Sequence, residues 1–215
     1  MTNRMEQPAP IALPDRPDRS GWVLDGLYRA GLGPETGGAV IAPPHPLYGG
    51  SLESPVVSEI GFACEKAGIA SLRFNWRGIG GSTGQRSGAP EDALEDYNAA
   101  LDFLEDSVSP PLVAAGYSFG AATAVVAAER TTVRRLVLVA PPPAMLDRTL
   151  VENFKGKIFI AVGDSDTLAP VGELEAIAKD LDHVQFEQLD QTDHFFVSGP
   201  GLKLLQSALS AWLEP

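Results

Sequence analysis

The sequence predicts an α/β fold, with a mostly parallel, doubly wound sheet, helices on both faces and no cap domain. Short continuous apolar runs, typical of strands buried in a parallel sheet, alternate along the chain with stretches of helical spacing. The chain has 215 residues, of which 44% are hydrophobic, enough for a sizeable core. We expect residues 1–20, rich in Pro, Asp and Arg, to be a flexible arm, and residues 21–215 to form one domain.

Charge and composition argue against several classes of partner. The formal net charge is −12, and an acidic protein repels both nucleic acid and anionic membrane surfaces. Cys64 is the single cysteine, so no internal disulfide forms, as is typical of a reducing compartment. The sequence has neither a signal-peptide pattern nor an apolar run long enough to cross a bilayer. We therefore expect a cytoplasmic protein with a small-molecule substrate and no membrane insertion. The sequence is compatible with both a monomer and a homodimer.

The first half of the chain shows its elements in order. Residues 22–30 alternate loosely, which is typical of an edge strand, and residues 39–42 form a short apolar run typical of a buried strand. A proline near its start and a glycine after its end bound a helix over residues 54–67. Residues 69–76 are predicted as the next strand, and a glycine-rich loop follows at 77–84.

The second half continues the alternation. Apolar residues recur at helical spacing over 91–105, and a pair of prolines then breaks the chain. The expected strands beyond it are 112–115, 135–140, 157–162 and 184–189, and the expected helices are 121–128, 170–181 and 201–213. The segment 141–156 is too short to fold as a cap.

A serine lies at a sharp turn between one of these strands and the helix that follows it. The turn reads Gly116-Tyr117-Ser118-Phe119-Gly120, and Gly-x-Ser-x-Gly between a strand and a helix is the pattern of a nucleophile elbow. Neighbouring chain would run so close that a side chain at position 116 or 120 would clash. The alternative is a serine that merely caps the helix.

A nucleophilic serine needs a base and a group that orients this base. Of the three histidines, only His194 follows the last expected strand, where the chain order Ser…Asp…His requires the base. The acid should follow the strand that ends near residue 162, where Asp164 and Asp166 are both candidates and spacing alone does not separate them. Asp193 is adjacent to the histidine in extended chain and is expected to be solvated.

An oxyanion that forms during attack on a carbonyl needs backbone N–H donors. Phe119, which follows the serine, is one expected donor. The second should come from the loop after residues 39–42, where the prolines at 43, 44 and 46 have no N–H. Leu47 or Tyr48 remain as candidates, and His45 is less favoured.

Two further groups of residues invite interpretation. The loop Gly78–Gly84 lacks both the third glycine of a dinucleotide fingerprint and the lysine of a P-loop, so nucleotide binding is not expected. No Cys/His cluster has metal-ligand spacing, and no cofactor is expected. Tyr48, Tyr117 and Phe195 are candidates for a substrate pocket, whereas we expect Trp76 to belong to the core.

Four motifs together resemble a known group of proteins. The chain is similar, over roughly residues 25–213, to the compact, lid-less bacterial α/β-hydrolases and to dienelactone-hydrolase-like esterases. The motifs that carry this resemblance are Pro44-His45-Pro46-Leu47-Tyr48-Gly49-Gly50, Leu72-Arg73-Phe74-Asn75-Trp76-Arg77-Gly78, the elbow, and Asp193-His194-Phe195-Phe196.

The resemblance implies roles that the residues alone leave open. The family pattern Gly-x-x-Asp-x-x-Val-Pro aligns with residues 163–170, with Ala169 in place of the valine, and selects Asp166 as the acid. The same alignment favours Leu47 as the oxyanion donor. It implies a serine hydrolase, and we expect a carboxylesterase for short- to medium-chain acyl esters that acts through an acyl-enzyme. A peptidase or thioesterase with the same triad, and a catalytically silent interaction module, are the alternatives.

Overall fold

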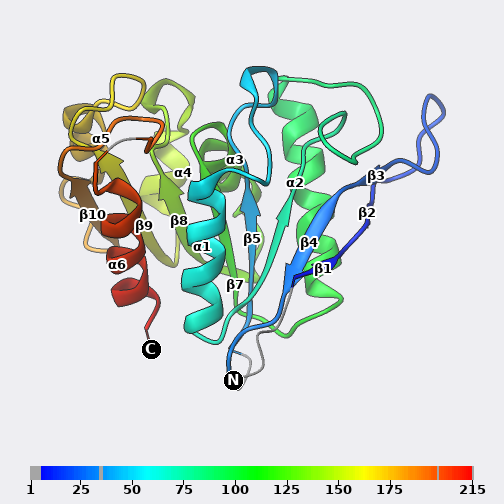
Figure 1. Ribbon diagram of the computed structural model, residues 1–215, viewed down its shortest axis with the longest axis horizontal. Helices are drawn as coiled ribbons and strands as arrows, with labels where there is room; N and C mark the ends of the chain where they lie inside the picture. Colours follow the sequence, from blue (N-terminus) through cyan, green and yellow to red (C-terminus); the bar gives the residue numbers. More distant parts are fainter. Residues whose placement is uncertain (1–5, 34–35, 198, 215) are drawn as a thin grey trace.

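The molecule is built on one mixed sheet of eight strands, which lie side by side in Figure 1 from β10 on the left to β1 on the right. A computed structural model describes residues 6–33, 36–197 and 199–214. The strand order is β1-β4-β6-β5-β7-β8-β9-β10. The six strands β6, β5, β7, β8, β9 and β10 run parallel to one another, while β4 and β1 are antiparallel to their neighbours. The strands are β1 (Gln7–Pro8), β4 (Gly26–Arg29), β5 (Gly38–Ala42), β6 (Ala70–Phe74), β7 (Leu112–Tyr117), β8 (Val133–Val139), β9 (Lys157–Gly163) and β10 (Val184–Leu189).

Helices cover both faces of this sheet. In Figure 1, α1 and α6 lie in front of the strands, and α2, α3 and α4 lie behind them. The helices are α1 (Pro55–Lys66), α2 (Pro90–Glu105), α3 (Phe119–Ala127), α4 (Arg148–Asn153), α5 (Val171–Ala178) and α6 (Gly201–Leu213), with short 3₁₀ turns η1 (Pro46–Tyr48) and η2 (Pro143–Met145). Because both faces are covered, the central strands are buried throughout, and all residues of β5, β6 and β7 are buried.

The predicted alternation of strands and helices is confirmed. The last strand and the last helix begin and end where the sequence pattern places them, and Gly68 follows α1 with φ +77°, the left-handed conformation that ends helices. The segment 141–156 holds η2 and the short helix α4, which the sequence analysis did not predict. Its six helical residues add no cap over the sheet.

The prediction of a flexible arm over residues 1–20 was wrong for residues 6–20; residues 1–5 lie outside the described part. β1 pairs with β4, and β2 (Ile11–Ala12) pairs with β3 (Val23–Leu24). Ile11 is fully buried, and Leu13 is 5% exposed. A few apolar side chains therefore anchor this segment, although its average composition is polar. As a result β1, not the strand expected at 22–30, is the edge of the sheet.

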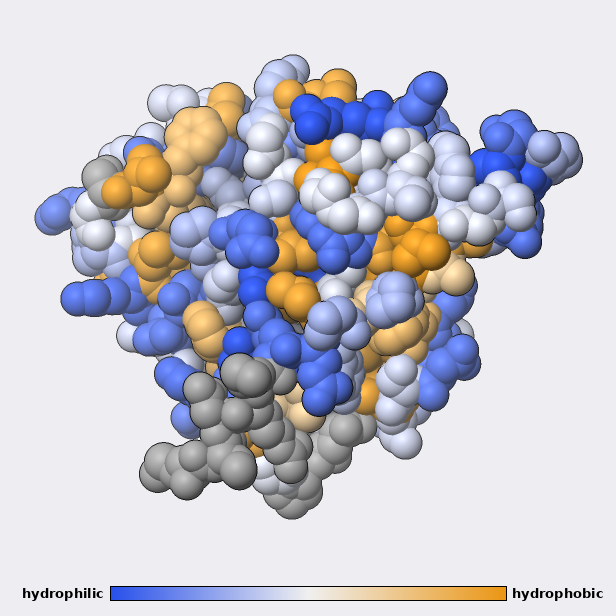
Figure 2. All heavy atoms as spheres, turned by 45° about the vertical axis from the view of Figure 1, so that its right-hand side comes forward, coloured by the Kyte–Doolittle hydropathy of each residue, from blue (hydrophilic) through white to orange (hydrophobic). Residues whose placement is uncertain are grey.

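Hydrophilic residues cover much of the face of the molecule that Figure 2 shows. On the face in Figure 2, apolar residues form separate patches among hydrophilic ones. In the described part of the chain, no helix has the length and apolar character needed to cross a membrane. The loops that follow the parallel strands meet at one end of the sheet, at the top of Figure 1, and this end carries the candidate residues.

Candidate active site

Ser118 lies at the tip of the turn between β7 and α3, in a backbone conformation that few residues adopt. Its φ is 54° and its ψ is −118°, and its N–H donates to the carbonyl of Val139 at 2.8 Å. A Cβ on Gly116 would lie 2.3 Å from the carbonyl of Gly120, and a Cβ on Gly120 would lie 2.5 Å from the carbonyl of Ala42. The predicted clash at both glycines is confirmed, and tight packing holds the strained turn in place.

Three side chains from distant parts of the chain form one line of hydrogen bonds. His194 Nε2 lies 3.0 Å from Ser118 Oγ, and His194 Nδ1 lies 2.7 Å from Asp166 Oδ2. All three residues are buried. Because the carboxylate accepts from Nδ1–H, Nε2 is left as an acceptor that faces the serine hydroxyl. The arrangement can thus withdraw a proton from Ser118.

The loops that follow β9 and β10 hold the acid and the histidine. Asp166 Oδ1 accepts hydrogen bonds from the N–H groups of Leu168 at 2.8 Å and Ala169 at 2.7 Å, so its other oxygen points at the ring. The Tyr117 hydroxyl donates to the His194 carbonyl at 2.6 Å. Burial, together with the nearby carboxylates of Asp166 and Asp193, raises the pKa of Tyr117, so this hydroxyl keeps its proton.

The other acid candidate has a different position. Asp164 is exposed, and its Oδ1 accepts from the N–H of Thr192 at 3.1 Å and from the hydroxyl of Ser165 at 3.0 Å. Hydrogen bonds from the backbone N–H groups of Gln191 and Thr192 lower the pKa of Asp164. Asp164 therefore ties the loop after β9 to the loop that carries His194, while Asp166 is the carboxylate that touches the ring.

The expected oxyanion donors lie at the start of α3 and in the loop after β5. Phe119 is the first residue of α3, where backbone N–H groups have no intrahelical partner. The Leu47 N–H donates to His45 Nδ1 at 3.2 Å, and the Tyr48 N–H donates to the His45 carbonyl at 3.1 Å. The ring centroids of His45 and Phe119 lie 4.6 Å apart. Burial lowers the pKa of His45. The neutral ring thus serves as an acceptor inside this loop, a role that the sequence analysis missed.

Hydrogen bonds with polar side chains elsewhere in the chain fix the glycine-rich loop after β6. Asp25 Oδ2 accepts from Asn75 Nδ2 at 2.9 Å and from the Gly81 N–H at 3.1 Å. Just before the loop, the Arg77 side chain donates to Asp96 Oδ1, with Nε at 2.9 Å, and both residues are buried. These contacts account for the conformation of the loop without a bound nucleotide.

A cavity of about 380 Å³ opens beside the elbow, between α2, α3 and η2. Its lining is mostly apolar and includes Leu94, Phe119, Ala122, Val126, Ala144 and Met145. The sequence analysis missed this cavity, because it forms only when the segment after β8 meets the faces of α2 and α3. Apolar residues at positions 119, 122 and 126, which share one face of α3, were the only signal for it.

The aromatic residues expected to line a substrate pocket differ in exposure. Tyr48 is 87% exposed and Phe195 is 64% exposed, whereas Tyr117 is buried against His194. None of the three lines the cavity beside the elbow. Trp76 is 1% exposed and packs edge-on against Phe119, which confirms its expected place in the core. The ring centroids of Phe195 and His194 lie 5.5 Å apart, so Phe195 stays a candidate for a substrate pocket.

The described residues contain no group of three His, Cys, Asp or Glu side chains that could hold a metal ion. His183, in particular, lies apart from the line of three residues, and its Nε2 contacts the carbonyl of Val151 at 3.1 Å. The third histidine, His45, lies in the loop after β5, at the start of η1.

Comparison with known proteins gives relatives of similar length and architecture. An uncharacterized protein of Rickettsia prowazekii is 26% identical over 185 residues, which are 80% of this chain and 77% of that protein. An alpha-beta serine hydrolase homologue from Coxiella burnetii is 28% identical and has a TM-score of 0.83, over 99% of this chain and 98% of that chain. A Xanthomonas campestris protein, described as an α/β serine hydrolase without lid, is 24% identical with a TM-score of 0.80, over 95% of this chain and 93% of that one.

These likenesses confirm the expected α/β-hydrolase fold without a lid. The sequence model of the family described as "Serine aminopeptidase, S33" matches residues 49–159, just over half of the chain. The matched range runs from the end of the loop after β5 through Ser118 and its helix to the middle of β9. The chain thus belongs to the S33 serine aminopeptidase family, within the α/β-hydrolase superfamily.

Proposed function

We propose that this chain is a carboxylesterase that hydrolyses short- to medium-chain acyl esters through an acyl-enzyme. The observation that carries the proposal is the buried line from Ser118 Oγ through His194 to Asp166, with distances of 3.0 Å and 2.7 Å. Ser118 Oγ attacks the ester carbonyl while His194 Nε2 takes its proton, and Asp166 holds the ring and stabilises its positive charge.

The ester bond then breaks with the help of the same histidine. The protonated His194 gives its proton to the leaving alcohol oxygen, which leaves the acyl group on Ser118. Water enters, loses a proton to His194 and attacks the acyl carbonyl, and the carboxylic acid departs when the proton returns to Ser118 Oγ. Each tetrahedral intermediate carries a negative oxygen that needs preorganised N–H donors.

We assign these donors to Phe119 and Leu47. The Phe119 N–H follows the nucleophile at the start of α3, where the helix dipole also favours negative charge. The Leu47 N–H donates at 3.2 Å to His45 Nδ1, a long bond for this type. A negative oxygen is a stronger acceptor than a neutral ring nitrogen, so the developing charge would draw this N–H away from His45.

A panel of p-nitrophenyl esters of graded acyl length tests the proposal. We expect kcat/KM to be highest for acyl chains of about two to six carbons, where each buried methylene contributes roughly 0.8 kcal/mol, and to fall beyond about ten. Ser118→Ala should remove hydrolysis while the protein stays folded. A variant that retains more than about a tenth of the wild-type rate, in preparations free of contaminating esterase, would refute the assignment.

A peptidase is the second candidate, because the matched family is described as a serine aminopeptidase. The same triad cleaves amides when the enzyme also positions and protonates a poorer leaving group. Aminoacyl p-nitroanilides and the corresponding p-nitrophenyl esters separate the two activities. A kcat/KM for the anilide equal to or above that of the ester would favour the peptidase.

A further inference from the structure

The cavity beside the elbow lies along one face of α3, starting at the residue that follows Ser118. Phe119, Ala122 and Val126 line it, and their spacing of three and four residues places them in one row along the helix. Leu94 of α2 and Met145 of η2 close its sides. A volume of about 380 Å³ falls within the range of small-molecule pockets and suits an apolar group of moderate size.

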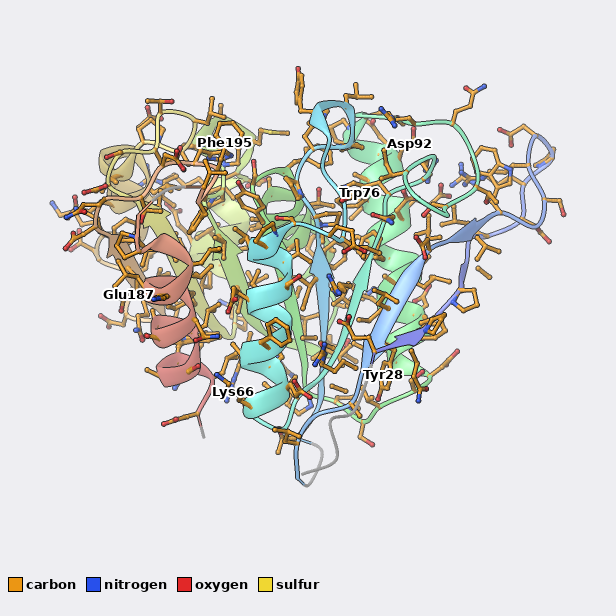
Figure 3. The ribbon with its side chains drawn as sticks, viewed as in Figure 1. Tyr28, Lys66, Trp76, Asp92, Glu187 and Phe195 are labelled. Carbon is orange, nitrogen blue, oxygen red and sulfur yellow. The ribbon has the colours of Figure 1, made fainter. Side chains whose placement is uncertain are left out.

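The position of His194 determines which part of an ester would enter this cavity. The leaving alcohol oxygen must lie within reach of His194 Nε2, which donates its proton. The cavity is lined from α2, α3 and η2, and no residue of the loop around His194 is among its lining. Figure 3 shows the same separation, since Phe195 and Asp92 are labelled on opposite sides of the upper end of the sheet.

From this geometry we propose that the cavity is the acyl pocket, and that it takes uncharged acyl chains in preference to chains that end in a carboxylate. The proposal rests on the proposed esterase function. A carbonyl held at Ser118 by the Phe119 N–H directs its acyl chain over the Phe119 side chain and along α3, while the alcohol faces His194.

Glu91 supplies the preference for uncharged chains. It lies in the first turn of α2, is exposed, and is the charged residue in the lining of the cavity. The structure gives its carboxylate no hydrogen bond or ion pair within the described residues. An acyl chain of a dicarboxylic acid would bring a second carboxylate toward it, and like charges at a solvent-exposed site repel each other by a factor of several in affinity.

Filling the cavity tests the first half of the proposal. Ala122→Phe should lower the ratio of kcat/KM for p-nitrophenyl hexanoate to that for p-nitrophenyl acetate by at least about tenfold, because each buried methylene contributes about fourfold. Ala176→Phe, on the exposed face of α5 and outside the cavity, is the matched control and should leave the ratio unchanged. A melting curve confirms that each variant is folded, and an unchanged ratio in folded Ala122→Phe would overturn the assignment.

A binding measurement separates this proposal from the esterase function. In the Ser118→Ala background, calorimetry with p-nitrophenyl hexanoate and acetate reports the pocket without turnover. Tighter binding of the hexanoate, lost with Ala122→Phe, supports the pocket even if the wild type hydrolyses neither ester, in which case only the esterase function fails. Equal binding of the two esters, or a hexanoate preference that survives Ala122→Phe, overturns the pocket.

Replacing the charge tests the second half. The p-nitrophenyl monoester of adipic acid and p-nitrophenyl hexanoate differ by a terminal carboxylate. Glu91→Gln should raise the adipate-to-hexanoate ratio of kcat/KM about threefold to tenfold, with a smaller effect at high salt. Glu173→Gln removes one charge from the first turn of α5, outside the cavity, and should leave the ratio unchanged. Equal ratios in Glu91→Gln and the wild type would overturn the role of Glu91.

Discussion

The two aspartates after β9 allow one substitution to be tested against a close neighbour. In Asp166→Asn, the amide oxygen can still accept from Leu168 and Ala169, so the amide nitrogen faces His194 Nδ1. That nitrogen donates, which forces Nδ1 to accept and moves the ring proton to Nε2. Nε2 then points its proton at Ser118 Oγ, 3.0 Å away, and cannot act as the base.

The expected loss is large for this variant and small for its neighbour. A wrong histidine tautomer lowers kcat by on the order of 10⁴, about 5.5 kcal/mol in the activation barrier. In Asp164→Asn, the amide oxygen keeps the bond from the Thr192 N–H, and this exposed residue does not touch the ring, so kcat should stay within about threefold. Steady-state hydrolysis of p-nitrophenyl acetate by both variants measures the difference. A larger loss in Asp164→Asn would exchange the two roles and refute the reasoning.

Two predictions concern the framework of the site. Gly120→Ala places a Cβ 2.5 Å from backbone oxygens at the end of β5, so urea denaturation should show a loss of about 1–3 kcal/mol, whereas Gly172→Ala, with nothing within 4 Å, should cost nothing; equal stabilities would contradict the close packing. Burial raises the pKa of Glu95, but Arg19 and Arg77 outweigh it and lower this pKa to about 2. The ion pairs thus stabilise the fold above the usual pKa of 4.5, and the stability difference between wild type and Glu95→Gln should shrink as pH falls from about 4.5 to about 2; a constant difference would refute the linkage.

Local patterns predicted those parts of the fold that depend on local physics. Continuous apolar runs marked the central strands, because strands buried on both faces need no polar side. Gly116 and Gly120 marked the elbow, because backbone passes within contact distance of both. The prediction of the edge strand was wrong, because the pairing of β1 with β4 depends on a few apolar residues in an otherwise polar segment.

The parts of the site that depend on long-range packing could not be predicted from spacing. Asp164 and Asp166 both follow β9, and only the fold shows which carboxylate meets His194; the family pattern, not the spacing, selected Asp166. The acceptor role of His45 depends on the turn η1, and the cavity depends on the approach of Met145 to α3. Neither feature has a local sequence signature.

The central claim is that Ser118 is a nucleophile activated by His194, and covalent labelling tests it most directly. A fluorophosphonate should add one label per chain, and peptide mapping by mass spectrometry should place it on Ser118. Labelling should disappear in Ser118→Ala and become slower by orders of magnitude in Asp166→Asn, because phosphonylation needs the same base. A folded wild-type protein that takes no label, or takes it on another serine, would contradict the account.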